Sequence, residues 1–86
     1  NRVETMIYIN PQHTVYEVIK AHPEYKAVLI EAGFSKLADS GMLNTMGKIM
    51  TLEKGMMLRN IAIDDLERVS NTYHFTLFYE KIEKQL

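Results

Sequence analysis

The chain has 86 residues, enough for one hydrophobic core and too few for two domains that each need their own. Ten Lys and Arg residues oppose eleven Asp and Glu, and this balance, mixed along the chain, argues against phosphate-driven nucleic-acid binding. The absence of cysteine excludes disulfides, thiol catalysis and cysteine-ligated metal or iron–sulfur sites. No apolar run approaches the roughly 20 residues of a membrane span and no signal peptide is evident, so we expect a cytoplasmic protein.

The N-terminal segment predicts a strand and then a helix. Met6–Ile9 is a short β-prone run that ends at an Asn-Pro turn signal. Thr14 and Glu17 have the spacing of a capping box, in which each side chain accepts from the other residue's backbone N–H. The helix should stop at His22, because a residue that precedes proline, here Pro23, is disfavoured in the helical region.

A second helix is predicted from Pro23, whose missing N–H costs nothing in the first turn, where Glu24 also suits the helix dipole. Its apolar residues, Ala27–Ala32, are nearly continuous, so this helix should be the most buried. Gly33 is expected to end it in a left-handed conformation, and Phe34 to fold back onto the helix.

The central segment is rich in methionine. Ser35–Gly41 is interpreted as a polar loop that leads to one short third helix. Methionines spaced by four on that helix usually form core, although flexible thioethers can also line a partner groove or a ligand pocket. The apolar positions of this helix are Met42, Leu43, Met46, Ile49 and Met50.

Two further helices are predicted towards the C-terminus. Thr51 can cap a fourth helix, expected to be short and frayed because Gly55 inside it costs about 1 kcal/mol relative to alanine. Asp64 and Glu67 resemble a second capping box, preceded by Ile63 as a hydrophobic staple, and predict a fifth helix.

The last segment alternates in polarity. Tyr73–Tyr79 fits a strand better than a helix, and such a strand could pair with Met6–Ile9, leaving a helical turn or two for Glu80–Leu86. The whole chain, 1–86, is therefore expected to be one all-α or nearly all-α domain. We predict an orthogonal array of four to five short helices, with minor strands at both ends.

No catalytic or metal site is predicted. His13 and Glu17 are four residues apart, but His13 lies before the Thr14 cap and does not share a helix face with Glu17. Asp64 and Asp65 are adjacent, so their side chains point in different directions and suit helix capping and dipole interactions. No serine elbow, P-loop or dinucleotide fingerprint occurs. We therefore predict no enzyme, no metal and no cofactor.

Two segments carry a family resemblance. Tyr16–Glu24 contains His-Pro-Glu, and Val28–Phe34 is a helix that ends in Gly-Phe, in the order and at the separation of one small bacterial family. The chain resembles the hybrid-cluster-protein-associated (redox-disulfide) domain-of-unknown-function family, number 1858. The resemblance runs from about Ile9 to Phe75.

Members of the redox branch place two cysteines just after Gly-Phe, where this chain has Lys36 and Asp39. Their disulfide chemistry is therefore not carried over. Asn44–Lys48 and Thr51-Leu52 are instead similar to a cysteine-free branch of Gram-positive bacteria. Similar domains accompany haemerythrin-like and sensory proteins or resemble the N-terminal domain of iron–sulfur-repair di-iron proteins, which implies a helical accessory domain.

The expected function is protein interaction. A loop held by the Gly33 cap is a natural place to present binding residues, and the resemblance implies a metal-, redox- or nitrosative-stress partner. The chief alternative is a binder of a small apolar ligand such as haem. The expected interaction residues are Lys36, Asp39, Asn44 and Lys48; the alternative surface is Met42, Met46, Met50 and Met57.

Overall fold

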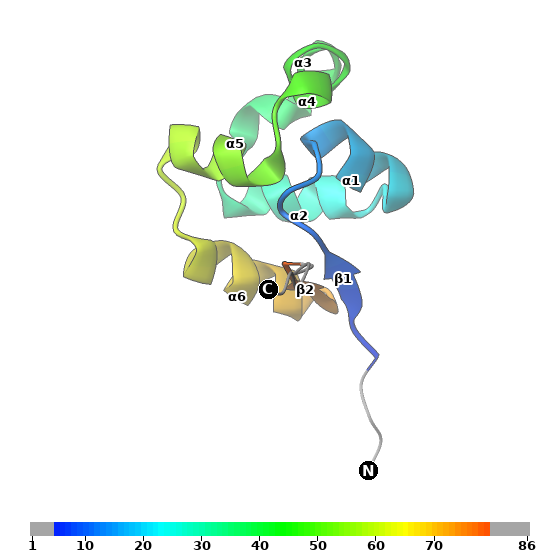
Figure 1. Ribbon diagram of the computed structural model, residues 1–86, viewed down its shortest axis with the longest axis vertical. Coiled ribbons are helices and arrows are strands. Elements are labelled where there is room, and N and C mark those ends of the chain that lie inside the picture. Colours follow the sequence, from blue (N-terminus) through cyan, green and yellow to red (C-terminus); the bar gives the residue numbers. More distant parts are fainter. Residues whose placement is uncertain (1–4, 80–86) are drawn as a thin grey trace, which may run out of the picture.

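Short helices dominate residues 5–79, the part of the chain that the computed structural model describes. The predicted nearly all-α fold, with a minor strand at each end, is confirmed; the helical turn predicted for 80–86 lies outside the described residues. None of the helices in residues 5–79 has the length and apolar character needed to cross a membrane. The order is β1 (Ile7–Ile9), α1 (Val15–Ala21), α2 (Tyr25–Ala32), the 3₁₀ helix η1 (Ser35–Ala38), α3 (Ser40–Asn44), α4 (Met46–Ile49), α5 (Leu52–Arg59), α6 (Ile63–Thr72) and β2 (Phe75–Leu77) (Figure 1).

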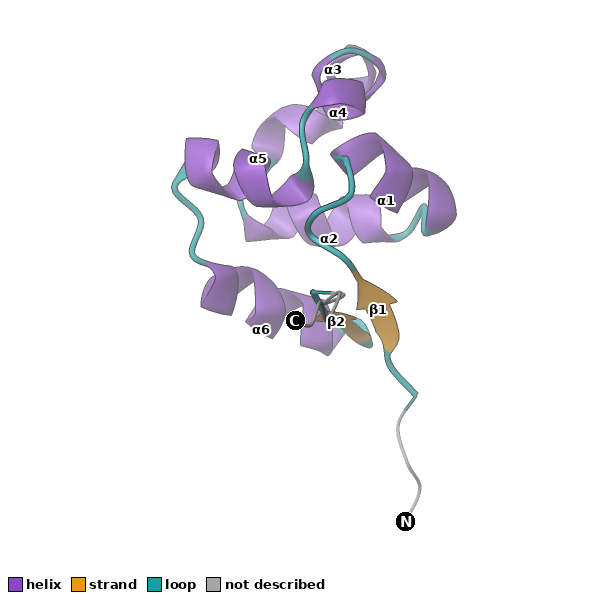
Figure 2. Cartoon of the chain, in the orientation of Figure 1, coloured by secondary structure: helices purple, strands orange, loops and turns teal. Residues whose placement is uncertain are grey.

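The helix α2 lies in the middle of the molecule. Figure 2 shows α1 and α5 on one side of it and α6 on the other, with α3 and α4 at the end farthest from the strands. The strands β1 and β2 form a two-stranded parallel sheet in which Ile7 lies opposite Phe75. Parallel strands need a long crossover connection. Here all the helices from α1 to α6 lie in the connection between β1 and β2.

The start and end of α1 follow the sequence prediction. The backbone N–H of Glu17 donates to Thr14 Oγ1 at 3.0 Å, and that of Thr14 donates to Glu17 Oε1 at 2.9 Å. The helix ends at His22, which has φ −136° and ψ 83° before Pro23. A bridge between Thr14 and Thr51 joins the starts of α1 and α5.

The end of α2 is also as predicted, but its start is not. Pro23 lies in the turn before the helix, which begins at Tyr25. The carbonyl of Pro23 accepts from the backbone N–H of Lys26. Gly33 has φ +132°, a conformation that a side chain disfavours. The N–H of Phe34 then reaches back to the carbonyl of Leu29 at 2.9 Å, which completes a Schellman-type cap and buries the Phe34 ring.

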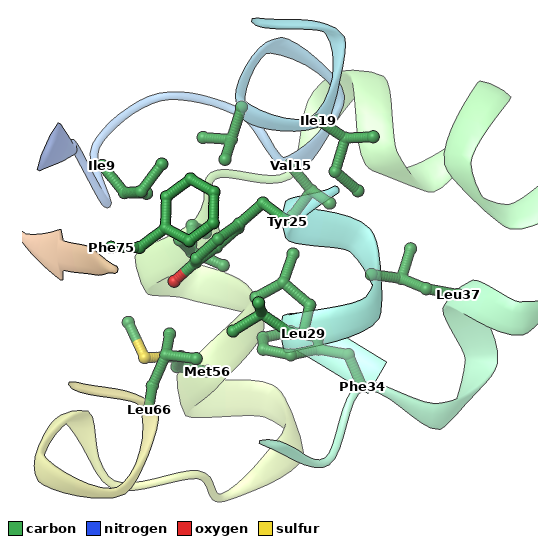
Figure 3. Packing of buried hydrophobic residues seen from close by; sticks show 13 residues of the cluster. Ile9, Val15, Ile19, Tyr25, Leu29, Phe34, Leu37, Met56, Leu66 and Phe75 are labelled. Atoms are coloured by element: carbon green, nitrogen blue, oxygen red, sulfur yellow. The ribbon is translucent and has the colours of Figure 1, made fainter. Parts of the chain in front are cut away.

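A buried tyrosine ties α2 to α6 and β2 (Figure 3). The Tyr25 hydroxyl lies 2.7 Å from Ser70 Oγ, and both residues are fully buried. Its ring meets that of Phe75 edge to face, with centroids 4.8 Å apart. The apolar run of α2 was predicted to be buried, but Ala27 is exposed. Tyr25, outside that run, is the centre of the packing.

The central segment differs most from the prediction. The expected polar loop contains η1, with Leu37 buried, and α3 begins at 40. The expected third helix is two helices that meet at Thr45, whose φ and ψ are −114° and −86°. The Thr45 hydroxyl donates to the carbonyl of Gly41 at 2.7 Å. A threonine side chain that bonds to the backbone in this way competes with helix continuation.

The fourth and fifth helices are present, but the second capping box is absent. Thr51 caps α5 as predicted, accepting from the N–H of Lys54 at 3.0 Å. Asp64 does not cap α6, because the helix already begins at Ile63. The cap position is Ala62, which makes no side-chain hydrogen bond. Glu67 instead accepts from the Thr76 hydroxyl and the Leu77 N–H, at 2.7 and 2.8 Å, and so holds β2 on α6.

Candidate functional site

A cavity of about 350 Å³ opens at the end of the molecule opposite the sheet. Its lining comes from the start of α1 and from η1, α3, α4 and α5. Three of the six methionines contribute, although they lie on or beside two separate helices and not on the single helix predicted from their spacing. The apolar lining side chains are Val15, Phe34, Leu37, Met42, Met46, Met50 and Leu58.

The floor of this methionine cavity depends on a glycine in α5. A β-carbon built on Gly55 would lie 3.0 Å from Cε1 of the Phe34 ring. Gly55 was predicted to weaken its helix, but the structure shows that it is buried and leaves room for this ring. The chain therefore has a poor helix former at a position of α5 where a larger side chain would meet the Phe34 ring.

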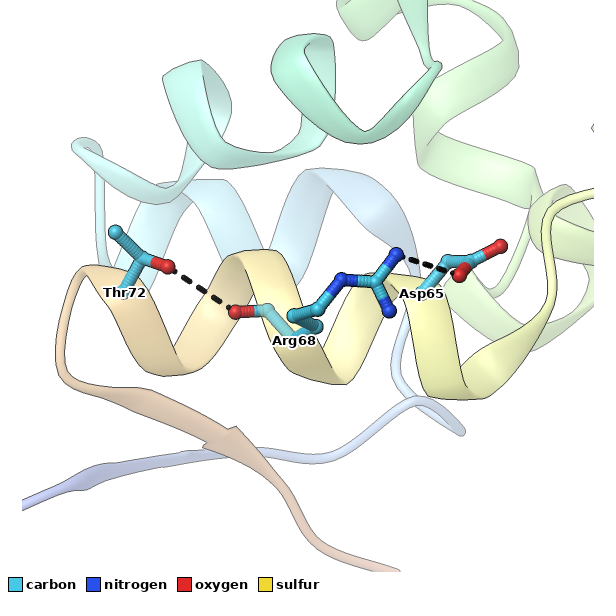
Figure 4. A network of polar contacts seen from close by, with 3 residues as sticks. All are labelled: Asp65, Arg68 and Thr72. Atoms are coloured by element: carbon cyan, nitrogen blue, oxygen red, sulfur yellow. Dashed lines mark hydrogen bonds and ion pairs between the residues drawn. The ribbon is translucent and has the colours of Figure 1, made fainter.

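Two cationic side chains complete the lining. Lys36 comes from η1 and Arg59 from the last turn of α5, and both residues are exposed. None of the described residues that line the cavity is acidic. Within residues 5–79 the one ion pair joins Arg68 and Asp65 at 2.7 Å (Figure 4), on α6, which contributes nothing to the lining. Neither cation of the cavity is thus neutralised by a carboxylate of the described chain.

The predicted interaction residues are only partly brought together. Lys36 lines the cavity, whereas Asp39 caps α3, accepting from the N–H of Gly41 at 3.0 Å. Asn44 is exposed at the end of α3, outside the lining. Lys48 lies over the ring of Tyr16, with Nζ 5.0 Å from its centroid, in a cation–π contact that joins α4 to α1.

The predicted methionine surface needs one correction. Met42, Met46 and Met50 share the cavity, but Met57 does not line it and is 74% exposed. Its neighbour Leu58, 67% exposed, contributes to the lining instead. Leu58 and Arg59 were missed because the sequence does not show which residues of α5 face the cavity; the packing of that helix in the fold decides it.

Two of the three histidines line a second cavity, of about 280 Å³, near the sheet. His13, Glu17 and His22 all contribute to it, together with the exposed rings of Tyr8 and Phe78. Glu17 is already occupied by its capping bond, and no cluster of three or more ligating residues suited to a metal occurs in residues 5–79. Metal-free protein stays a prediction, which elemental analysis of the purified chain would test.

Comparison with known proteins places the chain in a family. The family described as a domain of unknown function, DUF1858, matches residues 9–66. The chain belongs to this family. The match ends in α6, short of the limit near Phe75 expected from the sequence.

One solved structure resembles the chain over almost its whole length. The crystal structure of the conserved domain protein from Streptococcus pneumoniae TIGR4 is 29% identical in sequence, with a TM-score of 0.80. The alignment covers 92% of this chain and all of that one. No curated protein matches the sequence. The family and its fold are therefore shown, and the function has to be argued from the site.

Proposed function

We propose that this DUF1858 member is a non-catalytic accessory domain that docks to a larger protein through the surface around the methionine cavity. The observation that supports docking is an apolar cavity bordered by exposed apolar side chains, Met46 and Leu58, and by a charged rim. Contiguous exposed apolar surface with a polar rim is typical of protein interaction sites. Methionine suits such a surface because its unbranched thioether adapts to different shapes.

The class of partner is a separate proposal. The resemblance to domains that accompany haemerythrin-like proteins, or that resemble part of iron–sulfur-repair di-iron proteins, supports a partner concerned with metal, redox or nitrosative stress. The chain itself has no cysteine with which to perform thiol chemistry. It would therefore position or regulate the partner and leave the redox step to it.

Two neighbouring residues of α5 provide a matched test. Leu58 lines the cavity and Met57 does not, yet both are largely exposed. We expect Leu58→Gln to reduce capture of the partner from cells that make the protein by about tenfold, or roughly 1.4 kcal/mol, and Met57→Gln to leave it unchanged. Capture is quantified by mass spectrometry after both variants are shown to be folded. Equal recovery with the two variants would place the docking surface elsewhere.

A second candidate function is binding of a small apolar ligand such as haem. The volume of about 350 Å³ favours it, because ligand pockets in proteins begin at about 300 Å³. Native mass spectrometry of the purified protein separates the two functions. A stoichiometric small molecule that is lost in Met46→Gln would favour the ligand, and its absence together with partner capture would favour docking.

A further inference from the structure

We propose that the methionine cavity recognises an acidic apolar segment of the partner protein, in which a large apolar side chain enters the cavity and a neighbouring Asp or Glu pairs with Lys36 and Arg59. This inference rests on the proposed docking function and names the chemistry that the docking surface selects.

Charge complementarity is the first argument. Lys36 and Arg59 both line the cavity, and within residues 5–79 no acidic residue lines it and no carboxylate forms an ion pair with either cation. The acidic residue nearest to Lys36 in sequence, Asp39, accepts from the N–H of Gly41 at the start of α3. The planar guanidinium of Arg59 suits a carboxylate because it can donate two parallel hydrogen bonds.

The apolar lining sets the second requirement. The lining includes three methionines, Phe34 and Leu58, which would leave a buried polar group without a hydrogen-bond partner. The group that enters the cavity therefore has to be apolar. The cavity is at the low end of ligand-pocket volumes. It therefore suits one or two large side chains of a segment, with its charged neighbours left at the rim beside the two cations.

Selection from random linear peptides displayed on phage tests the proposal with the full chain as bait. Three variants are compared. The cavity variant carries Lys36→Gln and Arg59→Gln, the control carries Lys20→Gln and Lys54→Gln, and Leu58→Gln is the variant of the docking test. The control removes the same charge from residues that do not line the cavity. Any general effect of net charge is therefore equal in the two proteins.

We expect the enriched peptides to carry Leu, Met, Phe or Trp next to Asp or Glu. The cavity variant should bind these peptides about tenfold more weakly than the wild type, and the control less than about twofold more weakly. Added salt should weaken peptide binding to the wild type, because it screens the charges that attract the peptide. Peptides that need Leu58 but carry no acidic residue, or that bind the cavity variant normally, would overturn this inference and leave the docking function standing. If no enriched peptide depends on Leu58, both proposals fail.

Discussion

The two ends of the molecule are packed in different ways. At the sheet end, the rings of Tyr25 and Phe75 pack edge to face beside Ile9 (Figure 3). A buried hydroxyl pair also joins α2 to α6. At the far end, short helices surround an open cavity lined by flexible methionines. A small domain has little stability to spare. We therefore expect substitutions in the sheet end to cost more stability than substitutions at the rim of the cavity.

The largest effect should come from emptying the sheet end. Phe75→Ala removes a fully buried ring that contacts Tyr25, so we expect the free energy of unfolding to fall by about 3–5 kcal/mol. Phe78→Ala is the matched control, because the Phe78 ring is half exposed, and should cost less than about 1 kcal/mol. Urea unfolding followed by circular dichroism measures both. Similar losses in the two variants would mean that burial of the Phe75 ring is not what stabilises the sheet end.

The joint between the two ends is Gly33, which turns the chain from α2 into η1. Gly33→Val should cost about 1–3 kcal/mol, because the backbone has φ +132° and a β-carbon would also meet Ile61 at 3.0 Å. Gly41→Ala, in α3, meets only ordinary contacts and should be neutral or stabilising. A Gly33→Val protein with an unchanged urea midpoint would contradict the assigned backbone.

The buried hydroxyl pair should make the sheet end sensitive to alkali. Burial raises the pKa of Tyr25 from 10.0 to about 12, and its hydrogen bond with Ser70 acts in the opposite direction. Because the folded-state pKa lies above the unfolded value, the stabilisation is complete below about pH 10 and is lost as the pH rises towards 12. The loss is about 1.4 kcal/mol for each pH unit.

Tyr25→Phe separates this titration from that of other groups. At about pH 8 the variant should be about 1–2 kcal/mol less stable than the wild type, because Ser70 keeps a buried hydroxyl without its partner. At about pH 11 most of this difference should disappear, since only the wild type must keep the buried phenol protonated. Urea unfolding at the two pH values measures the difference. A constant gap would mean that Tyr25 does not titrate as its burial implies.

Local signals in the sequence were enough for part of the fold. The Thr14 capping box, the Thr51 cap and the Gly33 stop were all predictable, because each depends on residues within one turn of helix. The alternation of residues 73–79 was likewise sufficient to predict β2. The helix ends are therefore specified locally, whereas β2 also depends on its pairing with β1, in which Ile7 lies opposite Phe75.

What the sequence did not predict depends on contacts between distant residues. Glu67 has capping-box spacing to Asp64, but its carboxylate is held by β2, ten residues further on. Tyr25 is central because α6 brings Ser70 to its hydroxyl. The cavity was anticipated only as a methionine stripe, since the break at Thr45 and the packing of α5 decide which side chains meet. Of the predicted interaction residues, only Lys36 reaches it.

The smallest effects should come from the polar rim of the cavity end. Lys36→Ala and Asn44→Ala remove exposed side chains that form no ion pair or side-chain hydrogen bond with another residue of 5–79. Each replacement should change stability by no more than about 0.5 kcal/mol. Asp39→Ala is expected to cost more, about 1 kcal/mol, because it leaves the N–H of Gly41 at the start of α3 without its acceptor. Thermal unfolding of the three variants resolves this order. Equal effects would show that α3 does not depend on its cap, and a large loss in Lys36→Ala would mean that this lysine stabilises the fold and is not free to bind a partner.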